Sequence, residues 1–242
     1  MKEIRAKYKI NPQGFNSIKD YSEINNNKLK IAIIGDSYIE GFQGDVSESI
    51  GRLIEKEANN TIEVHEYGMS GWNIIDYQLY YTQYVKNKYD VTFILMSNED
   101  FRHIEPSSFG KGNESTKNTL LRKLYNKTFF IRYLNMNHGL KSKLIELFSF
   151  PNYNKNSLSN SSFEINNTTS YFEIFDSSCI ILHESKKLNL ENFKALKLKT
   201  LEIEHKIYPI NFGFDSHWND NGRQNVASTI YYFLVEESFL KP

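Results

Sequence analysis

Short apolar runs alternate with amphipathic segments in the first hundred residues of the chain. Ile31 to Ile34 and Val91 to Met96 are nearly continuous apolar runs, and Thr61 to Tyr67 has the length of another strand. Such runs are typical of strands that are buried on both faces of a parallel sheet. Apolar residues recur at helical spacing from Val46 to Ile54 and from about Asn73 to Lys88. The pattern therefore predicts three parallel strands joined by helices.

The middle of the chain has a less regular pattern. Residues 101–117 are rich in Gly, Ser, Asn and charge, residues 118–149 carry Leu and Ile at helix-like spacing, and residues 151–170 are dominated by Asn and Ser. We therefore expect an insertion within residues 101–206, with a helical part that walls the functional site and a long surface loop. The pattern becomes regular again at Cys179 to His183, which predicts a fourth strand.

The end of the chain completes the predicted sheet. Leu190 to Leu198 has the pattern of a short helix, and Thr200 to Glu204 has that of a weaker fifth strand. A final amphipathic helix is indicated by the apolar residues Val226, Ile230, Phe233 and Leu234. The predicted fold class is α/β: a doubly wound parallel sheet of about five strands flanked by helices, in a single domain of residues 1–242 with the helical and loop insertion.

Two local signals concern the first half of this domain. Residues 1–29 are polar and contain turn residues, so we expect an extended lead-in. Asp45 is followed three residues later by Glu48, a spacing that resembles a capping box and predicts the start of the first helix.

Composition and charge exclude several classes of function. Lysine and arginine total 29, as do aspartate and glutamate, so no net charge steers the chain to nucleic acid or to an anionic membrane. The single cysteine, Cys179, excludes an internal disulfide, and the six histidines lack the spacing of a metal site. No segment has the pattern of a signal peptide or the length of a transmembrane helix. We expect a soluble chain, cytoplasmic if it is full length and from the cell envelope if it is a fragment of an exported protein.

The first candidate for chemistry follows the Ile31 to Ile34 run. Gly35, Asp36 and Ser37 come directly after these apolar residues. Because ligands of open α/β sheets bind at the carboxyl ends of the strands, Ser37 is a candidate nucleophile. The same three residue types favour turns, so a simple turn is the alternative interpretation.

A serine hydroxyl needs a general base, and a segment before the final helix supplies one. Asp215 and His217 are a carboxylate and an imidazole that together suit this task. A doubly wound sheet can return this segment to the edge where Ser37 lies. The alternatives are that His217 is a polar loop residue and that Asp215 is the N-terminal cap of the final helix.

Together these segments resemble the four sequence blocks of the SGNH hydrolases, which are GDSL-like serine esterases and acyltransferases. Gly35-Asp36-Ser37 matches the nucleophile block, Gly68 the glycine block, Asn98 the asparagine block, and Asp215-Ser216-His217 the acid–base block. The blocks occur in the family's order along most of the chain. The resemblance implies a three-layer SGNH or flavodoxin-like sandwich.

The chain departs from the family pattern at three places. Tyr38 stands where Leu is usual, Ser97 stands where Gly usually precedes the asparagine, and only Ser216 separates the acid from the base where many members have two residues. The sequence from Asp215 through Trp218 and Asn219 is nevertheless similar to that of members that act on acylated polysaccharides.

The resemblance implies a role for each block. Ser37 would attack an ester carbonyl, His217 would act as the base and Asp215 would orient it. The backbone N–H groups of Ser37 and Gly68 and the side-chain amide of Asn98 would form the oxyanion hole. At position 68 a glycine permits either a close backbone approach or a positive-φ turn. A mechanism of this kind requires no metal or organic cofactor.

The implied substrate is an acylated carbohydrate, expected to be O-acetylated, or another small ester, while the oligomeric state stays open. The alternative function is a catalytically inactive glycan-binding accessory protein of polysaccharide assembly.

Trp72 and Trp218 either line a sugar groove or fill the core. Ser70 fails as a nucleophile because its segment is one residue short of G-x-S-x-G, and the chain contains neither a dinucleotide-binding glycine motif nor a P-loop.

Overall fold

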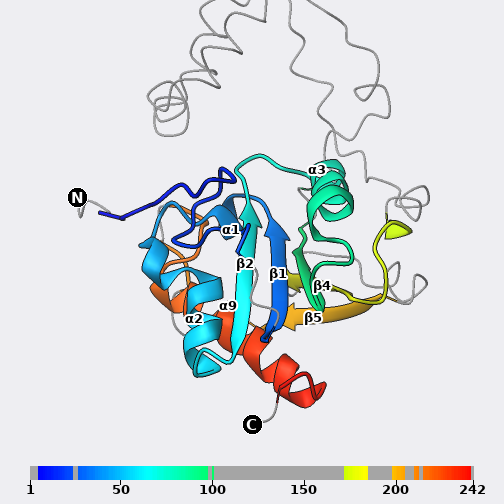
Figure 1. Cartoon of the computed structure of the whole chain (residues 1–242). Coiled ribbons are helices and arrows are strands. Elements are labelled where there is room, and N and C mark those ends of the chain that lie inside the picture. Colours follow the sequence, from blue (N-terminus) through cyan, green and yellow to red (C-terminus); the bar gives the residue numbers. More distant parts are fainter. Residues whose placement is uncertain are drawn as a thin grey trace, which may run out of the picture. The chain divides into compact units, whose positions relative to one another are not determined.

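A five-stranded parallel sheet forms the centre of the fold (Figure 1). Its strands are β1 (Leu29–Gly35), β2 (Ile62–Gly68), β3 (Val91–Leu95), β4 (Cys179–Glu184) and β5 (Lys199–Ile203). They lie in the order β2-β1-β3-β4-β5, and each neighbouring pair is parallel. The predicted α/β class and the positions of the five strands are therefore confirmed.

The structure is a computed structural model, and it describes residues 5–23, 27–97, 100, 172–184, 198–204, 210–212 and 215–240. All of these residues belong to one compact unit. The predicted loop 101–117, helical part 118–149 and Asn/Ser-rich loop 151–170 lie outside the described residues. Nearly all of the short helix predicted at residues 190–198 lies outside them too.

The strand order contains a reversal that positions the functional site. From β1 the chain crosses to β2 on one side, and it then returns past β1 to β3 on the other side. Such a reversal is a topological switch point, and it lies at the carboxyl ends of β1 and β3. Ser37 follows β1 and Ser97 follows β3, so both residues lie near this switch point.

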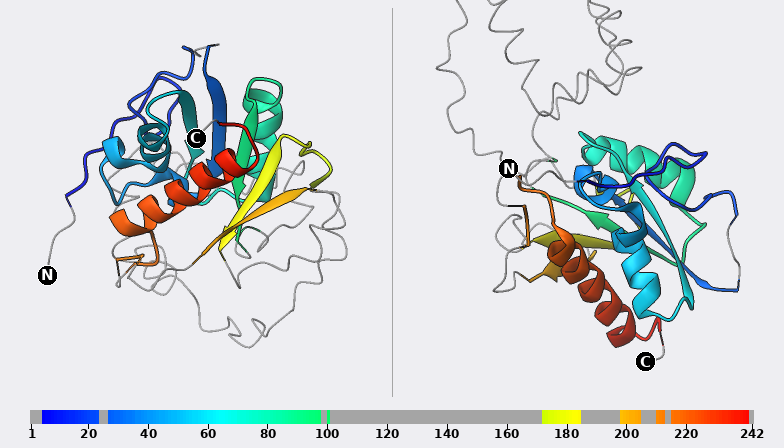
Figure 2. Two further views of the ribbon diagram at one scale, coloured as in Figure 1. Left: turned by 90° about the horizontal axis from the view of Figure 1, so that it is seen from below. Right: turned by 90° about the vertical axis from the view of Figure 1, so that its left-hand side faces the viewer.

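Helices cover both faces of the sheet. The face with Ile31 and Ile33 packs against α2 (Ile50–Glu57) and α9 (Asp220–Glu236), which lie side by side (Figure 2). The opposite face, with Ala32 and Ile34, packs against α3 (Ile74–Tyr80) and the π-helical turn η2 (Tyr81–Val85). Alternate residues of β1 thus enter two separate cores, which explains why its sequence is apolar without a break.

The N-terminal segment is packed more closely than the extended lead-in that the sequence predicted. Phe15 and Tyr21 are buried and join the core on the α3 face. The Tyr21 hydroxyl donates to the carbonyl oxygen of Glu66 at 2.9 Å and accepts from its N–H at 3.0 Å. Because β2 is an edge strand, these bonds cover backbone groups that would otherwise lie open at the sheet edge.

Side chains of α2 cover the next position of the same edge. Val64 donates its N–H to Glu55 Oε1 at 2.7 Å, and its carbonyl oxygen accepts from the Arg52 guanidinium. Arg52 and Glu55 also form an ion pair. The outward backbone groups of Val64 and Glu66 are therefore both bonded.

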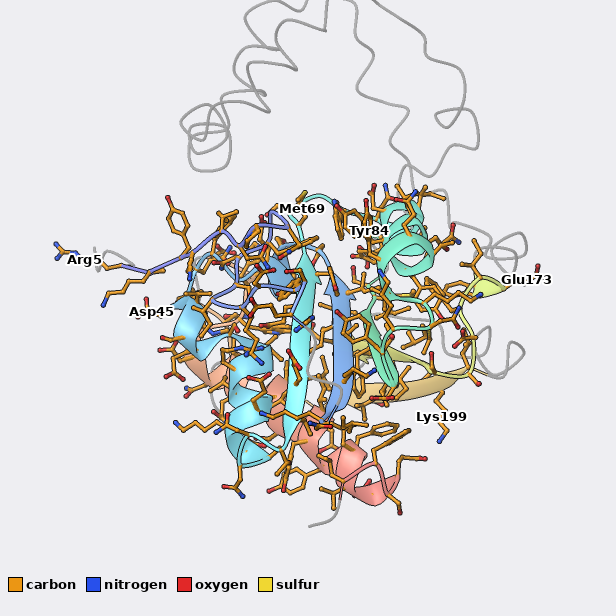
Figure 3. The ribbon with its side chains drawn as sticks, viewed as in Figure 1. Arg5, Asp45, Met69, Tyr84, Glu173 and Lys199 are labelled. Atoms are coloured by element: carbon orange, nitrogen blue, oxygen red, sulfur yellow. The ribbon has the colours of Figure 1, made fainter. Side chains whose placement is uncertain are left out.

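The capping box predicted at Asp45 and Glu48 is wrong. Asp45 precedes a short 3-10 turn, η1 (Val46–Glu48), and makes no side-chain cap there. Its carboxylate instead accepts from the backbone N–H of Lys7 at 2.6 Å, on the side of the molecule where the N-terminal segment runs (Figure 3). A capping box does occur at α3, where Asn73 accepts from Ile75 N–H and Asp76 accepts from Asn73 N–H.

Candidate active site

The segment after β1 turns directly into a helix of a single turn. This helix, α1 (Ser37–Glu40), lies beside the carboxyl end of β2 (Figure 1). Asp36 caps it, because Asp36 Oδ1 accepts from the Tyr38 N–H at 3.0 Å. Burial raises the pKa of Asp36, although this hydrogen bond and the charge of His217 oppose the effect. Ser37 therefore begins a capped helix and is not part of a simple turn.

The structure brings Ser37, His217 and Asp215 together in one hydrogen-bonded series. His217 Nε2 lies 2.7 Å from Ser37 Oγ, and His217 Nδ1 lies 2.5 Å from Asp215 Oδ1. An ionised carboxylate can only accept, so the Nδ1 nitrogen is assigned the proton. The Nε2 lone pair then faces the Ser37 hydroxyl, which is the arrangement that a general base requires.

Asp215 holds both the ring and the backbone of His217. Its Oδ1 atom also accepts from the His217 backbone N–H at 3.0 Å. Partial burial would raise the pKa of Asp215, but the two hydrogen bonds from His217 and the attraction between the two side chains outweigh it and lower that pKa. Asp215 is therefore a carboxylate at neutral pH and orients the imidazole from two directions.

The segment around His217 is fixed at its far end. Trp218 is only 4% exposed and donates its Nε1–H to Glu184 Oε1, at the end of β4, at 2.9 Å. Asn219 is the N-cap of α9 and accepts from the Gly222 N–H at 3.0 Å. The alternative that Asp215 caps this helix is therefore wrong, and Trp218 belongs to the core.

Gly68 ends β2 next to α1, the helix that begins at Ser37. A Cβ atom at this position would lie 2.2 Å from the backbone nitrogen of Glu40 and 2.5 Å from the carbonyl carbon of Ile39. Gly68 is not among the described residues with positive φ. Glycine is therefore required here by the close approach of α1, and the turn alternative is wrong.

The backbone N–H of Gly68 points away from β1. The Met69 N–H donates to the carbonyl oxygen of Gly35 at 3.3 Å, so Met69 is the residue that bonds to β1 at this position. In a parallel pair the preceding residue of the same strand faces the other way, so the backbone groups of Gly68 point outward, as those of Glu66 do. Within the described part of the chain, no acceptor is bonded to the N–H of Gly68 or of Ser37. Both N–H groups are thus free to donate to a ligand.

A loop after β2 is tied to α1. The Glu40 carboxylate accepts from the Ser70 N–H at 2.7 Å and also from the Ser70 hydroxyl. The Ser70 side chain is therefore engaged by an acid and has no imidazole partner in these contacts, in agreement with its rejection as a nucleophile.

Asn98 lies outside the described residues, but Ser97 before it and Asp100 after it are described. The Ser97 N–H donates to Asp100 Oδ2 at 2.6 Å, and the Tyr77 hydroxyl donates to Asp100 Oδ1 at 2.9 Å. Asp100 is 5% exposed. Burial raises its pKa to about 7, against the hydrogen bond from Ser97, and the nearby charge of Asp36 adds to the rise.

Asp100 and Tyr77 are site residues that sequence reasoning missed. The one available signal was the position of Asp100, a carboxylate three residues after Ser97 at the end of a buried strand. Tyr77 appeared only as an apolar position of a helix. Their contact depends on the packing of α3 against the end of β3, which local sequence does not show.

The described residues contain neither a cluster of metal ligands nor a helix that could span a membrane. No group of three or more His, Cys, Asp or Glu side chains in the described residues is arranged to hold a metal ion. Within the same residues, every helix is too short or too polar to cross a membrane.

Comparison with known proteins gives matches of structure alone. The sequence matches no protein-family profile and no curated protein. A lipase/acylhydrolase from Enterococcus faecalis is 14% identical with a TM-score of 0.47, and the match covers 86% of this chain and 96% of that one. A lipolytic protein of the G-D-S-L family from Veillonella parvula is 12% identical with a TM-score of 0.43, over 88% of this chain and 99% of that one.

A family two carbohydrate esterase from Clostridium thermocellum, solved with cellohexaose, is also similar. It is 10% identical with a TM-score of 0.46, and the match covers 89% of this chain and 66% of the esterase. The similar solved structures thus include a GDSL lipolytic protein, a lipase/acylhydrolase and a carbohydrate esterase.

Proposed function

We propose that this chain is a serine esterase or acyltransferase of the SGNH type that acts on O-acyl esters of a carbohydrate. The observation that carries the proposal is the series of hydrogen bonds from Ser37 through His217 to Asp215. A nucleophile, a base and an orienting carboxylate in this order are the parts that acyl transfer through a serine requires. Spacing in sequence alone does not produce such an arrangement, because Ser37 and His217 are far apart in the chain.

In the first half of the reaction, Ser37 Oγ attacks the carbonyl carbon of the ester. Its proton passes to His217 Nε2, and Asp215 stabilises the imidazolium that forms. The tetrahedral intermediate then collapses, and the sugar hydroxyl leaves with the proton from His217. The acyl group stays on Ser37 as an ester.

In the second half, His217 takes a proton from an incoming hydroxyl group, which attacks the acyl-enzyme. Water as the attacking group gives an esterase, whereas a sugar hydroxyl gives a transferase. Collapse of the second intermediate returns the proton to Ser37 and releases the acyl group as an acid or a new ester.

The developing oxyanion needs donors about 3 Å away. The N–H groups of Ser37 and Gly68 are free of acceptors in the described residues, which supports their assignment as two of these donors. The side-chain amide of Asn98 is the proposed third. The hydrogen bond from the Ser97 N–H to Asp100 supports this role, because it fixes the residue that directly precedes Asn98 in the sequence.

The choice of carbohydrate ester, with acetyl as the expected acyl group, is supported by the sequence around the base. The residues from Asp215 to Asn219, followed by Gly222, resemble family members that act on acylated polysaccharides. A Cβ atom at position 222 would lie 2.1 Å from the carbonyl oxygen of Ile210, so this glycine allows α9 to begin close to the preceding segment. The zero net charge of the chain is compatible with a neutral glycan.

The test of the proposal is labelling with a fluorophosphonate, which reacts only with an activated serine. We expect the intact protein to be labelled on the peptide that contains Ser37. Ser37→Ala and His217→Ala should not be labelled, while Ser70→Ala, a matched control at a serine of the neighbouring loop, should be labelled like the wild type. No labelling of the intact protein would overturn the esterase proposal and favour the glycan-binding accessory protein.

The substrate class is tested with esters that differ in acyl group and alcohol. We expect p-nitrophenyl acetate to be preferred over the octanoate, and acetate to be released from an O-acetylated oligosaccharide. Adding unacetylated oligosaccharide as an acceptor would separate transfer from hydrolysis. A preference for long acyl chains would contradict the carbohydrate assignment.

A further inference from the structure

Tyr38 joins the nucleophile segment to the segment that carries the base. Its hydroxyl donates to the carbonyl oxygen of Ser216 at 3.0 Å. Its ring centroid lies 4.8 Å from that of His217, with the two planes 34° apart, and 4.9 Å from that of Trp218 in an edge-to-face arrangement. One side chain thus contacts three consecutive residues of the other segment.

Tyr38 and Trp218 are both held in place by further hydrogen bonds. Tyr38 directly follows Ser37, and its N–H is bonded to Asp36, so its backbone position is set by the cap of α1. Trp218 is buried and bonded to Glu184. The segment between Asp215 and Trp218 is therefore held by β4 at one end and by the Tyr38 side chain beside the imidazole.

We propose that Tyr38 is a positioning residue that holds His217 Nε2 within hydrogen-bonding distance of Ser37 Oγ, an inference that rests on the proposed function. Two of the places where the chain departs from the family pattern meet in this contact. Tyr38 replaces the usual Leu, and its hydroxyl bonds Ser216, the single residue between acid and base. The hydroxyl fixes the backbone of this short connection.

The ring of Tyr38 has a second effect. The aromatic face lies against the imidazole, which becomes a cation when it takes the Ser37 proton, and aromatic faces attract cations. Among the described residues, Asp215 contacts His217 through hydrogen bonds, and Asp36 interacts with it through its charge. Removing only the hydroxyl should therefore cost less activity than removing the ring.

The kinetic test compares Tyr38→Phe and Tyr38→Leu with the wild type on p-nitrophenyl acetate. Tyr38→Phe loses one hydrogen bond and should lower kcat about 5-fold. Tyr38→Leu removes the ring contact with His217 in addition to the hydrogen bond. It should lower kcat about 10²-fold, with KM changed no more than about twofold. Tyr84→Leu, at an exposed tyrosine whose described ring contact is with Tyr80, is the control and should keep the wild-type rate.

If Tyr38 had a purely structural role, its replacement would lower the stability of the fold. It would not lower kcat selectively over KM, and Tyr38→Phe would not keep more activity than Tyr38→Leu. Wild-type kcat in Tyr38→Leu, or a loss seen only in KM, would overturn the proposal. If Tyr38→Leu does not fold, as judged by circular dichroism, Tyr38→Phe decides alone. An unchanged kcat in Tyr38→Phe then overturns the proposal, and a loss of about 5-fold supports it.

Hydrogen exchange separates this proposal from the function on which it rests. The His217 N–H is bonded to Asp215, so its exchange rate reports how well the segment is held. We expect faster exchange in peptides that cover residues 211–220 in Tyr38→Leu and a smaller increase in Tyr38→Phe. If the wild type neither reacts with the fluorophosphonate nor hydrolyses esters, the function fails, whereas faster exchange still supports the positioning role. Unchanged exchange overturns that role.

Discussion

His217 Nε2 lies 2.7 Å from Ser37 Oγ, although 180 residues separate the two residues in the sequence. The fold accounts for this distance. Ser37 follows β1 at the switch point of the sheet, and the segment before α9 passes the same edge, where Trp218 is bonded to the end of β4. The site is therefore built between elements from both ends of the chain, and α1 gives Ser37 a fixed backbone.

The first prediction concerns Ser37 and His217 as a unit. Ser37→Ala should abolish turnover of p-nitrophenyl acetate without loss of the fold, because Ser37 is partly exposed and its side chain does not fill the core. His217→Ala should cause a loss of similar size, and the double variant should be no slower than either single variant. Rates measured on all three variants test this. A double variant that is much slower would show that the two residues act independently.

The second prediction concerns the tautomer of His217. Asp215→Asn places an amide where Nδ1–H now donates, and this amide can itself donate to Nδ1. The ring would then carry its proton on Nε2 and could not accept from Ser37. We expect kcat to fall about 10³- to 10⁴-fold with the fold intact. A rate within about tenfold of the wild type would exclude Asp215 from the series.

Much of the fold follows from local sequence, because the strands are buried on both faces. The apolar runs of β1 and β3 were recognisable for this reason. The capping signature at Asp45 failed because a distant backbone group, the Lys7 N–H, takes the carboxylate. The one-turn helix α1 is too short to show a hydrophobic period, so no local pattern indicates that Ser37 begins a helix.

Only the site residues that belong to a sequence motif could be predicted. Ser37, Asp215 and His217 were chosen because three residue types suit one reaction, and the structure places them together. Their catalytic roles remain predictions. The contacts of Tyr38 and Asp100 join elements that are distant in sequence, and no spacing rule reveals such contacts.

The third prediction concerns Asn98 as an oxyanion donor. Asn98→Ala removes a neutral amide whose hydrogen bond would strengthen as charge develops on the carbonyl oxygen. We expect kcat to fall about 10²- to 10³-fold with little change in KM. Steady-state kinetics on p-nitrophenyl acetate measure both constants. A change confined to KM would instead make Asn98 a residue that binds the ground state.

The fourth prediction concerns the close approach at Gly68. Gly68→Ala would place a Cβ atom 2.2 Å from the Glu40 nitrogen, so α1 has to move and carry Ser37 with it. We expect the free energy of unfolding to fall by about 1–3 kcal/mol and fluorophosphonate labelling to slow about 10²-fold. Ser70→Ala, in the adjoining loop, is the control for labelling. Wild-type stability of Gly68→Ala would show that α1 tolerates the added atom.

The last prediction uses the pKa of Asp100, which burial raises to about 7 from an ordinary value of 3.8. Between these two values the folded chain keeps a proton that the unfolded chain releases. The contribution of Asp100 to the free energy of unfolding therefore falls as pH rises from about 4 to about 7. Asp100→Asn removes this dependence, while its amide can still accept from the Ser97 N–H and pair with the Tyr77 hydroxyl.

Urea unfolding of Asp100→Asn and wild type at pH 4.5, 6 and 8 measures the difference. The variant should gain stability relative to the wild type as pH rises, by on the order of 3 kcal/mol in total. Asp20→Asn is the control, because hydrogen bonds from Ser22 lower the pKa of Asp20 and its variant should not gain stability with rising pH. A difference between Asp100→Asn and wild type that stays constant across this range would mean that Asp100 is ionised at pH 4.5. The buried bonds to Ser97 and Tyr77 would then be made by a carboxylate throughout.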